Sequence, residues 1–224
     1  MATSLNTTDD DKRAAALAAV EEVRPGMLVG LGTGSTAAFA IGRLGELVRG
    51  GLDSRAVATS LRTESMARMA GITLLDFAGV ESVDLTIDGA DEIDSRLFAI
   101  KGAGGAMLRE KIVAAASRRM IVIADASKRV ERIGRAKLPV EVLPFARAFV
   151  ATRLAGLGAK TAVRAERSDQ GNIIIDCLFP EIPDPSVLAA ALSGLPGVLG
   201  HGLFLDEVDC AYIGGGGRVI RLEK

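Results

Sequence analysis

Cysteine is scarce in this chain of 224 residues: Cys177 and Cys210 are the only two, and no close cluster of cysteine and histidine exists. This excludes a zinc site of the usual ligand spacing and a framework of disulfides. Two free thiols are typical of the reducing cytosol.

His201 is the only histidine. No serine or cysteine motif stands beside it, which argues against a Ser-His or Cys-His hydrolase and favours a structural or surface role.

An excess of one charge is also absent, since 27 basic and 28 acidic residues give a formal net charge of −1. The chain therefore has no overall field to attract nucleic acid or an anionic membrane, and any anion site must be local. No apolar run approaches the roughly 20 residues that a membrane span needs. The first residues, MATSLNTTDDDKR, are too polar and acidic for a signal peptide. We expect a cytoplasmic protein with neither nucleic acid nor membrane as a partner.

What the sequence does contain is a regular alternation of apolar runs and helical patterns over its first half. We expect a loose tail over residues 1–9 and then a helix from Asp10 or Asp11 that stops at Pro25 and Gly26. Further helices are expected at 35–49, 63–71 and 106–117, and strands at 27–32, 56–60, 72–77, 82–89, 97–102 and 119–125. Such alternation predicts an α/β fold with a mostly parallel sheet that is covered on both faces.

The pattern changes after Pro139, where the runs are expected to follow the order β-α-β-β-α-β. That order is the ferredoxin-like (βαββαβ) unit, an α+β arrangement small enough for a second domain. The last two apolar runs, 209–214 and 217–223, are expected to return to the first sheet. We therefore divide the chain into a main domain, residues 1–137 and 208–224, and a small domain, residues 138–207.

Glycine-rich and acidic segments follow four of the expected strands: GLGTGST, DGADE, KGAGG and DASK. Ligands of parallel sheets bind beyond the carboxyl ends of the strands. Because all four segments are placed at such ends, the sequence predicts one site made of four loops on one rim of the sheet.

The segment GLGTGST is not a dinucleotide fingerprint, because Ser35 stands where the third glycine belongs and the next strand ends in hydroxyls instead of an acid. It also lacks the lysine of a P-loop. What remains is a tight turn whose amides, with the hydroxyls of Thr33, Ser35 and Thr36, suit a phosphate or sugar oxygen. A structural strand-to-helix turn with Ser35 or Thr36 as the helix N-cap is the alternative.

The segment DGADEID fails as a calcium loop, since Gly89 and Ala90 interrupt the alternate oxygen ligands. Asp88 follows an apolar run, so its carboxylate should lie at the sheet rim, and Asp91 could turn toward the same pocket. Two nearby carboxylates push their pKa values apart, which can provide an acid and a base together. The alternative is a solvated acidic turn.

The segment KGAGGAMLREK supplies partners for these acids. Lys101 ends an expected strand and precedes glycines whose amides can approach an anion, an arrangement that suits an enolate-type oxygen. Glu110 shares a helix face with Met107, Val113 and Ala114, and desolvation there would raise its pKa toward the range of a general base. On its own, Glu110 would more often be a surface glutamate.

Two lysines could add local positive charge. Lys128 ends the segment DASK at the rim, and Lys12 in the first helix could reach it, although its spacing does not prove this. Arg109 and Lys111 are expected to be solvated.

Taken in order along the chain, the segments VGLGTGSTA, IDGADEID, KGAGGAMLREKI, IADASK, LPVEVLPFA and HGLF resemble the type A ribose-5-phosphate isomerases. The resemblance implies a Rossmann-like domain with a ferredoxin-like second domain, and a homodimer or homotetramer that needs no metal and no nucleotide cofactor. It implies an aldose–ketose isomerase that interconverts D-ribose 5-phosphate and D-ribulose 5-phosphate through an enediolate.

The resemblance also implies roles for particular residues. Glu110 would be the base that moves a proton between C1 and C2, Asp88 would assist ring opening and shuttle protons between the sugar oxygens, and Lys101 would hold the enediolate charge. Asp91 would assist Lys101 and the sugar hydroxyls. Residues expected to contact the sugar phosphate are Thr33, Gly34, Ser35, Thr36, Gly89, Ala90, Gly102, Ala103 and Gly104, with Lys128 and Lys12 facing its phosphate.

One departure from the family pattern is Ala103, which interrupts a run of glycines and would be strained if it needed a positive φ. Two other functions stay open at this stage. One is a sugar-phosphate sensor without catalysis, although the N-terminus has space for only one helix and no basic patch. The other is an NAD-dependent oxidoreductase, disfavoured by Ser35.

Overall fold

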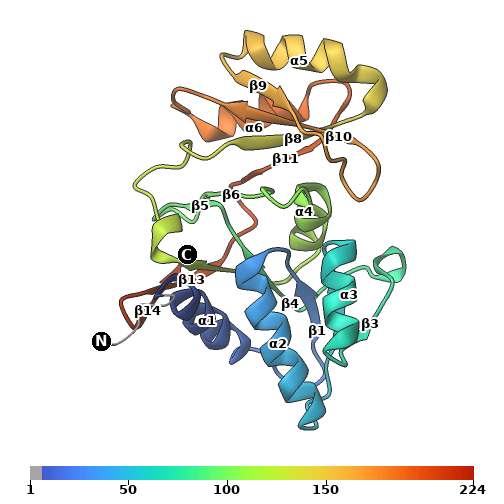
Figure 1. Cartoon of the computed structure of the whole chain (residues 1–224), viewed down its shortest axis with the longest axis vertical. Coiled ribbons are helices and arrows are strands. Elements are labelled where there is room, and N and C mark those ends of the chain that lie inside the picture. The colour runs from blue at the N-terminus through green and yellow to red at the C-terminus, as the bar shows by residue number, and fades with distance from the viewer. Residues whose placement is uncertain (1–6) are drawn as a thin grey trace.

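A computed structural model describes residues 7–224 (Figure 1). Its largest sheet is Rossmann-like and has seven strands in the order β14-β13-β7-β4-β1-β2-β3. Its strands are β1 (Leu28–Leu31), β2 (Arg55–Ala58), β3 (Thr73–Leu74), β4 (Leu85–Gly89), β7 (Met120–Asp125), β13 (Cys210–Gly215) and β14 (Arg218–Glu223). All neighbours are parallel except β13 and β14. The chain runs from β1 outward through β2 and β3 and then returns to β4 on the other side of β1. This reversal between β1 and β4 is the point where such sheets bind ligands.

The second sheet has four antiparallel strands in the order β11-β8-β10-β9 and lies at the top of Figure 1. It is formed by β8 (Leu138–Val142), α5 (Arg147–Gly156), β9 (Lys160–Val163), β10 (Ile173–Leu178), α6 (Pro185–Ser193) and β11 (Val198–His201). This is the predicted β-α-β-β-α-β order, and β13 and β14 return to the first sheet as expected. The division into domains at 138 and 207 stays a prediction.

A third, small sheet was not predicted. It contains β5 (Glu92–Ile93), β6 (Ala99–Ile100) and β12 (Leu203–Phe204), in the antiparallel order β12-β6-β5. The strand expected at 97–102 therefore does not join the parallel sheet, and the loop that follows Lys101 is not at the end of a parallel strand. A tight turn in which Leu97 takes a φ of 64° reverses the chain before β6, and a short apolar run does not reveal which strand it will pair with.

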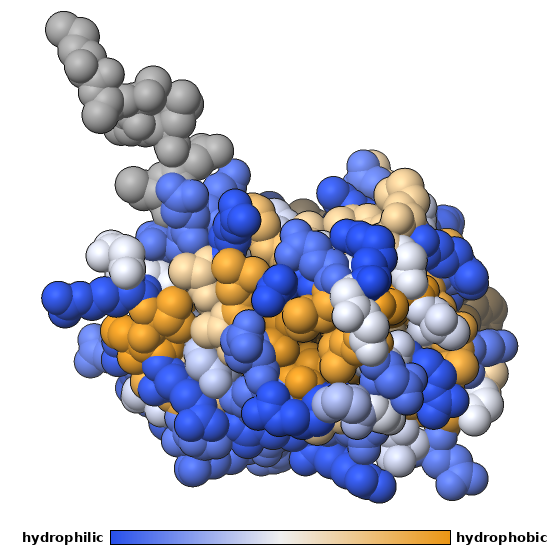
Figure 2. Space-filling view, turned by 90° about the horizontal axis from the view of Figure 1, so that it is seen from below, coloured by the Kyte–Doolittle hydropathy of each residue, from blue (hydrophilic) through white to orange (hydrophobic). Residues whose placement is uncertain are grey.

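The surface is mixed in polarity. Figure 2 looks at the molecule from below and shows hydrophobic side chains in the middle of that face, surrounded by hydrophilic ones. Within residues 7–224, no helix combines the length and the apolar character needed to cross a membrane.

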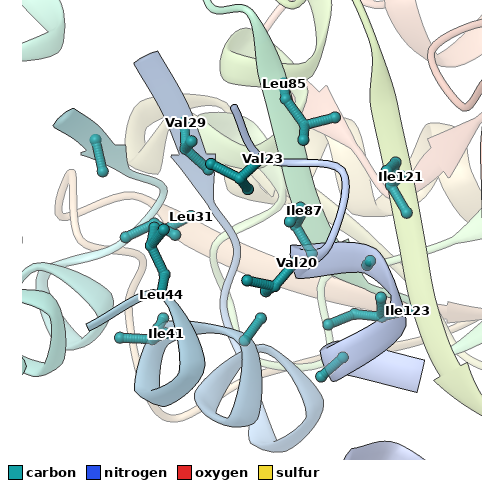
Figure 3. Close-up of a cluster of buried hydrophobic side chains, with 14 of the residues drawn as sticks. Val20, Val23, Val29, Leu31, Ile41, Leu44, Leu85, Ile87, Ile121 and Ile123 are labelled. Carbon is teal, nitrogen blue, oxygen red and sulfur yellow. The ribbon is translucent and has the colours of Figure 1, made fainter. Parts of the chain in front are cut away.

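The main core lies between the seven-stranded sheet and the helices α1 (Thr7–Val20), α2 (Ser35–Arg49) and α3 (Leu61–Met69). Alternate residues of each strand face this side, because successive side chains of a strand point to opposite faces. Figure 3 labels Val20, Val29, Ile41, Leu85 and Ile121 among the side chains of this core. The opposite face of the sheet packs against α4 (Met107–Ala115), through Val113 and Ala114. Three short 3-10 helices complete the fold: η1 (Phe77–Gly79), η2 (Ala126–Lys128) and η3 (Pro144–Ala146).

Helix ends depart from the prediction in several places. α3 covers Leu61–Met69 where 63–71 was predicted, and α4 covers Met107–Ala115 where 106–117 was predicted. α1 begins at Thr7, earlier than expected, with Asp9 and Asp10 in its first turn, and it ends at Val20 because the next residues form short turns before Pro25. The rest of the predicted tail lies outside the described residues. α2 has the predicted bounds, but its N-cap is Gly34, with a φ of 119° and no capping side chain, and not Ser35 or Thr36.

Candidate active site

A cavity of about 320 Å³ opens beyond the carboxyl ends of β1, β4 and β7. The predicted site residues that line it are Lys12, Thr33, Gly34, Ser35, Thr36, Gly89, Ala90, Asp91, Lys101, Gly102, Ala103, Gly104, Glu110 and Lys128. Thr8, Asp125 and Ser127 also line it and were not predicted. The last two belong to the segment DASK, so its position after a strand could have indicated them. A larger cavity, about 620 Å³, lies beside Phe77 and Ile112 and contains none of the predicted residues.

Three buried charges form the floor of the smaller cavity. The Nζ of Lys101 lies 2.8 Å from Oδ2 of Asp88 and 3.3 Å from Oε2 of Glu110. It also donates a hydrogen bond to the carbonyl oxygen of Gly89. The side chains of Asp88, Lys101 and Glu110 are 0%, 2% and 3% exposed. Asp88 does not line the cavity but lies behind the lysine.

Local structure fixes the position of each of these groups. Asp88 is the second-to-last residue of β4, and its Oδ1 accepts hydrogen bonds from the amides of Thr33 (3.0 Å) and Gly89 (2.7 Å). A side chain at Gly32 would overlap the Asp88 carboxylate, so the glycine lets the loop after β1 approach it. Glu110 is on the buried face of α4 together with Met107, as predicted.

Burial gives this cluster its unusual electrostatics. Desolvation, and after it the charge of Asp88, raise the pKa of Glu110 to about 8 against the opposing effect of Lys101. The predicted rise is thus confirmed. Burial alone would lower the pKa of Lys101, but the charges of Asp88 and Glu110 hold it above the ordinary value. Lys101 therefore stays an ammonium, while Glu110 can exchange a proton near neutral pH.

The loop between β6 and α4 has its positive φ angles at Gly102 (101°) and Gly105 (80°), and Ala103 is not among the positive-φ residues. The alanine that departs from the family pattern is therefore not strained. The amide of Ala103 donates to Oδ2 of Asp91 at 2.9 Å. Among the described residues, the amides of Gly102 and Gly104 have no hydrogen-bond partner. Asp91 and this loop together form one wall of the cavity.

The N-terminal end of α2 forms another part of the cavity lining, through Gly34, Ser35 and Thr36. The first amides of a helix have no intrahelical partner, and Gly34 supplies no capping side chain to α2, so these amides can bind an anion. Lys128, in η2, has no ion-pair partner among the described residues, and Lys12 lies 3.3 Å from Asp9. Both lysines line the cavity, so positive charge gathers at this end.

The hydroxyl of Thr33 has partners within the protein. It donates to Ser60 at 2.8 Å and lies 2.9 Å from the hydroxyl of Thr59. Contact between this hydroxyl and a ligand stays a prediction, and Thr33 lines the cavity. Thr59 and Ser60 follow β2 directly and are the hydroxyl residues that argue against a dinucleotide site. Their side chains hold the hydroxyl of Thr33.

Two further expectations can be compared with the structure. His201 is buried, its Nδ1 accepts from the amide of Leu203, and burial lowers its pKa to about 4, which agrees with a structural role. Lys111 was expected to be solvated, and this is wrong: it forms a 2.6 Å ion pair with Glu207 and packs over the ring of Phe204. No group of His, Cys, Asp and Glu side chains in the described part of the chain could hold a metal ion.

Comparison with known proteins points to one family. The profile described as ribose 5-phosphate isomerase A (phosphoriboisomerase A) matches residues 55–217. Ribose-5-phosphate isomerase A of Sphingopyxis alaskensis is 55% identical over 214 residues, which are 93% of this chain and 94% of that protein.

Solved structures give the same result. A D-ribose-5-phosphate isomerase in complex with phospho-erythronic acid superposes with a TM-score of 0.94 at 35% identity, over 98% of this chain and 100% of the other. Ribose 5-phosphate isomerase A from Neisseria gonorrhoeae has a TM-score of 0.92 at 36% identity, with 97% of each chain covered.

Proposed function

Because this chain belongs to the ribose 5-phosphate isomerase A family of isomerases, which interconvert ribose 5-phosphate and ribulose 5-phosphate, we propose that Glu110 and Lys101 carry out the proton transfer in the cavity described above. The observation that carries this proposal is the position of the Lys101 ammonium, 3.3 Å from the buried Glu110 carboxyl.

The reaction needs one base and one site for negative charge. In the direction from aldose to ketose, Glu110 takes the proton from C2 of the open-chain sugar. The electron pair of that C–H bond forms the C1–C2 double bond, and the C1 carbonyl oxygen becomes the enediolate oxygen. Glu110 then returns the proton to C1, the proton of the C2 hydroxyl passes to the C1 oxygen, and C2 becomes the carbonyl carbon. No electron acceptor outside the sugar is required.

Lys101 is suited to the negative charge because it is an ammonium that is already held in place and shielded from water. A donor that is preorganised in this way stabilises the transition state without reorganisation. The unpartnered amides of Gly102 and Gly104 add donors on the same wall. Glu110 is suited to the base, since a pKa of about 8 lets it accept a proton from carbon near neutral pH.

We assign supporting roles to the aspartates. Asp88 keeps Lys101 charged and in position. Its predicted role in ring opening and in proton transfer between the sugar oxygens requires that the ligand reach this buried carboxylate. Asp91 holds the amide of Ala103 with one oxygen and faces the cavity, where it can accept from a sugar hydroxyl. Gly89 and Ala90 line the same side.

The phosphate of the substrate is assigned to the other end of the cavity, at the first amides of α2 and the hydroxyls of Ser35 and Thr36, between Lys128 and Lys12. Charge and helix dipole both favour an anion there. A solved relative binds phospho-erythronic acid, which supports a phosphate-bearing ligand for this family's site. That compound carries a phosphate at one end and, at the other, a carboxylate that resembles the planar, negatively charged enediolate.

The test is an isomerase assay on purified protein that has been treated with a chelator. We expect turnover of D-ribose 5-phosphate by the wild type. Glu110→Gln should lose at least about 100-fold in kcat and still bind the sugar phosphate, because only the base is removed. Glu166→Gln, at an exposed position outside the cavity, is the matched control and should keep wild-type rates. A near-normal kcat for Glu110→Gln would refute the assignment of the base.

Three parts of the expectation stay predictions: independence from metal and nucleotide, the homodimer or homotetramer, and the cytoplasmic location. Large exposed apolar side chains, among them Phe145 at 97% exposure and Phe149 at 49%, support self-association through the side of the four-stranded sheet that carries η3 and α5.

A further inference from the structure

One side chain from beyond the main sheet reaches the loop that lines the cavity. Arg164 follows β9 directly, and its amide donates to the carbonyl oxygen of Ile174, so that its backbone continues the hairpin of β9 and β10. Its Nη1 donates to two carbonyl oxygens of the loop, those of Gly102 at 3.1 Å and Ala103 at 3.0 Å.

The rest of the guanidinium is held from behind. Its Nε and Nη2 donate to the two carboxylate oxygens of Asp176, at 3.0 and 2.6 Å, and these two side chains are 16% and 13% exposed. Two parallel bonds to one carboxylate fix the plane of an arginine. Arg164 therefore presents Nη1 to the loop in one orientation.

Peptide geometry transmits this contact to the cavity. The C=O and N–H of a trans peptide point in opposite directions, and no cis peptide bond occurs among the described residues. The carbonyl of Gly102 points to Arg164, and the amide of Ala103, in the same peptide, points to Asp91 on the cavity side. By the same rule, the carbonyl of Ala103 points to Arg164, so the unpartnered amide of Gly104 points toward the cavity.

We propose that Arg164, braced by Asp176, is a positioning residue of the isomerase: it orients the peptides on either side of Ala103 so that the Gly104 amide and Asp91 face the reacting end of the sugar. The inference rests on the proposed function of this cavity. Arg164 does not line the cavity itself and acts through the loop. Glycines at positive φ make the loop adaptable, and an external clamp on its carbonyls removes that freedom.

Attachment of the hairpin to the main sheet does not depend on Arg164 alone. Asp169 accepts a 2.7 Å hydrogen bond from the amide of Leu61, and Gln170 contacts Arg109 of α4. Loss of the Arg164 guanidinium should therefore loosen the loop while the hairpin stays docked, which separates positioning from folding.

The experiment compares Arg164→Met, which keeps much of the length of the side chain, with Arg164→Lys. The lysine keeps the charge but cannot make the two parallel hydrogen bonds to Asp176. Arg167→Met is the matched control, because Arg167 is exposed in the same hairpin and, among the described residues, hydrogen-bonds only to the carbonyl oxygen of Gly171. For Arg164→Met we expect kcat to fall about 10- to 100-fold, the usual loss when an oxyanion donor is misplaced. Arg164→Lys should recover part of this, and Arg167→Met should match the wild type.

Two inhibitors test whether the loss is in positioning. The affinity for phospho-erythronic acid, whose carboxylate mimics the enediolate, should fall in Arg164→Met by about the same factor as kcat/KM. The affinity for inorganic phosphate, which needs only the α2 end of the cavity, should not change.

An Arg164→Met variant with wild-type kcat and wild-type affinity for phospho-erythronic acid would overturn the inference. Equal weakening of both inhibitors with a large fall in Tm would also overturn it, since that would be a general structural loss. If the wild type were inactive, or Glu110→Gln fully active, the proposed function would fail instead, whatever Arg164 does.

Discussion

The ammonium of Lys101 lies 3.3 Å from the carboxyl of Glu110, although one follows β6 of the three-stranded sheet and the other is on α4. Two groups that would each be costly to bury alone are buried together. The charge of Lys101 does not fully offset the rise in the pKa of Glu110, because a second acid, Asp88, also pairs with the lysine and repels a second negative charge. Lys101 therefore stays charged and Glu110 stays easy to protonate, which is the division of roles that an isomerase needs.

This division predicts a pH dependence. The pKa of Glu110 is about 8, so below that pH the free enzyme holds a protonated base, and kcat/KM should fall about tenfold for each pH unit. Above about pH 8 it should level off. Asp88→Asn removes a negative charge that raises the pKa of Glu110, and the midpoint should therefore move to lower pH. Rates measured between pH 7 and 10 on the wild type, Asp88→Asn and the exposed control Glu166→Gln would show this. An unchanged midpoint in Asp88→Asn would contradict it.

The phosphate end can be tested apart from the chemistry. Lys128→Met removes a cavity-lining ammonium, and we expect KM for ribose 5-phosphate to rise about 10- to 100-fold with little change in kcat, the cost of one charged hydrogen bond. Arg129→Met, at the next position, is exposed outside the cavity and should have no effect. Steady-state kinetics at constant ionic strength would check both. A fall in kcat with KM unchanged would place Lys128 at the reacting end instead.

A pair of glycines gives a test of the fold around the site. Gly32→Ala would place a methyl group on the Asp88 carboxylate and against its Cα, and we expect at least about 1–3 kcal/mol of lost stability together with loss of activity. Gly42→Ala, at an open and exposed position within α2, should instead stabilise by about 0.5–1 kcal/mol. Urea denaturation of both variants measures the difference. A Gly32→Ala protein as stable as the wild type would mean that the two loops are not packed as described.

The parts of the site that the sequence predicted well are those that local patterns determine. Glu110 could be placed on the buried face of α4 from the helical spacing of Met107, Val113 and Ala114, and Asp88 at the end of a strand from the apolar run before it. The bounds of α2 followed from the loop before it and the glycines after Arg49.

The parts that the sequence did not reveal depend on distant pairing. Nothing in the run that contains Ala99 and Ile100 indicates a partner strand about a hundred residues later, so the sequence does not reveal that Lys101 reaches the cavity from the three-stranded sheet. The hydroxyl of Thr33 could not be assigned either, because its partners come from the end of β2 and the start of α3. Arg164 has no recognisable motif around it.

Pairing of β6 with β12 has a consequence for how the protein is made. The strand that leads into the lysine is completed only by Leu203 and Phe204, which leave the ribosome long after Glu110 and Asp88 have been synthesised. Until these two residues are made, β6 has only β5 as a partner strand, so the backbone that leads to the Lys101 ammonium lacks one of its two neighbours. The lysine that balances the two buried acids is therefore positioned by segments about a hundred residues apart, and its placement depends on long-range strand pairing.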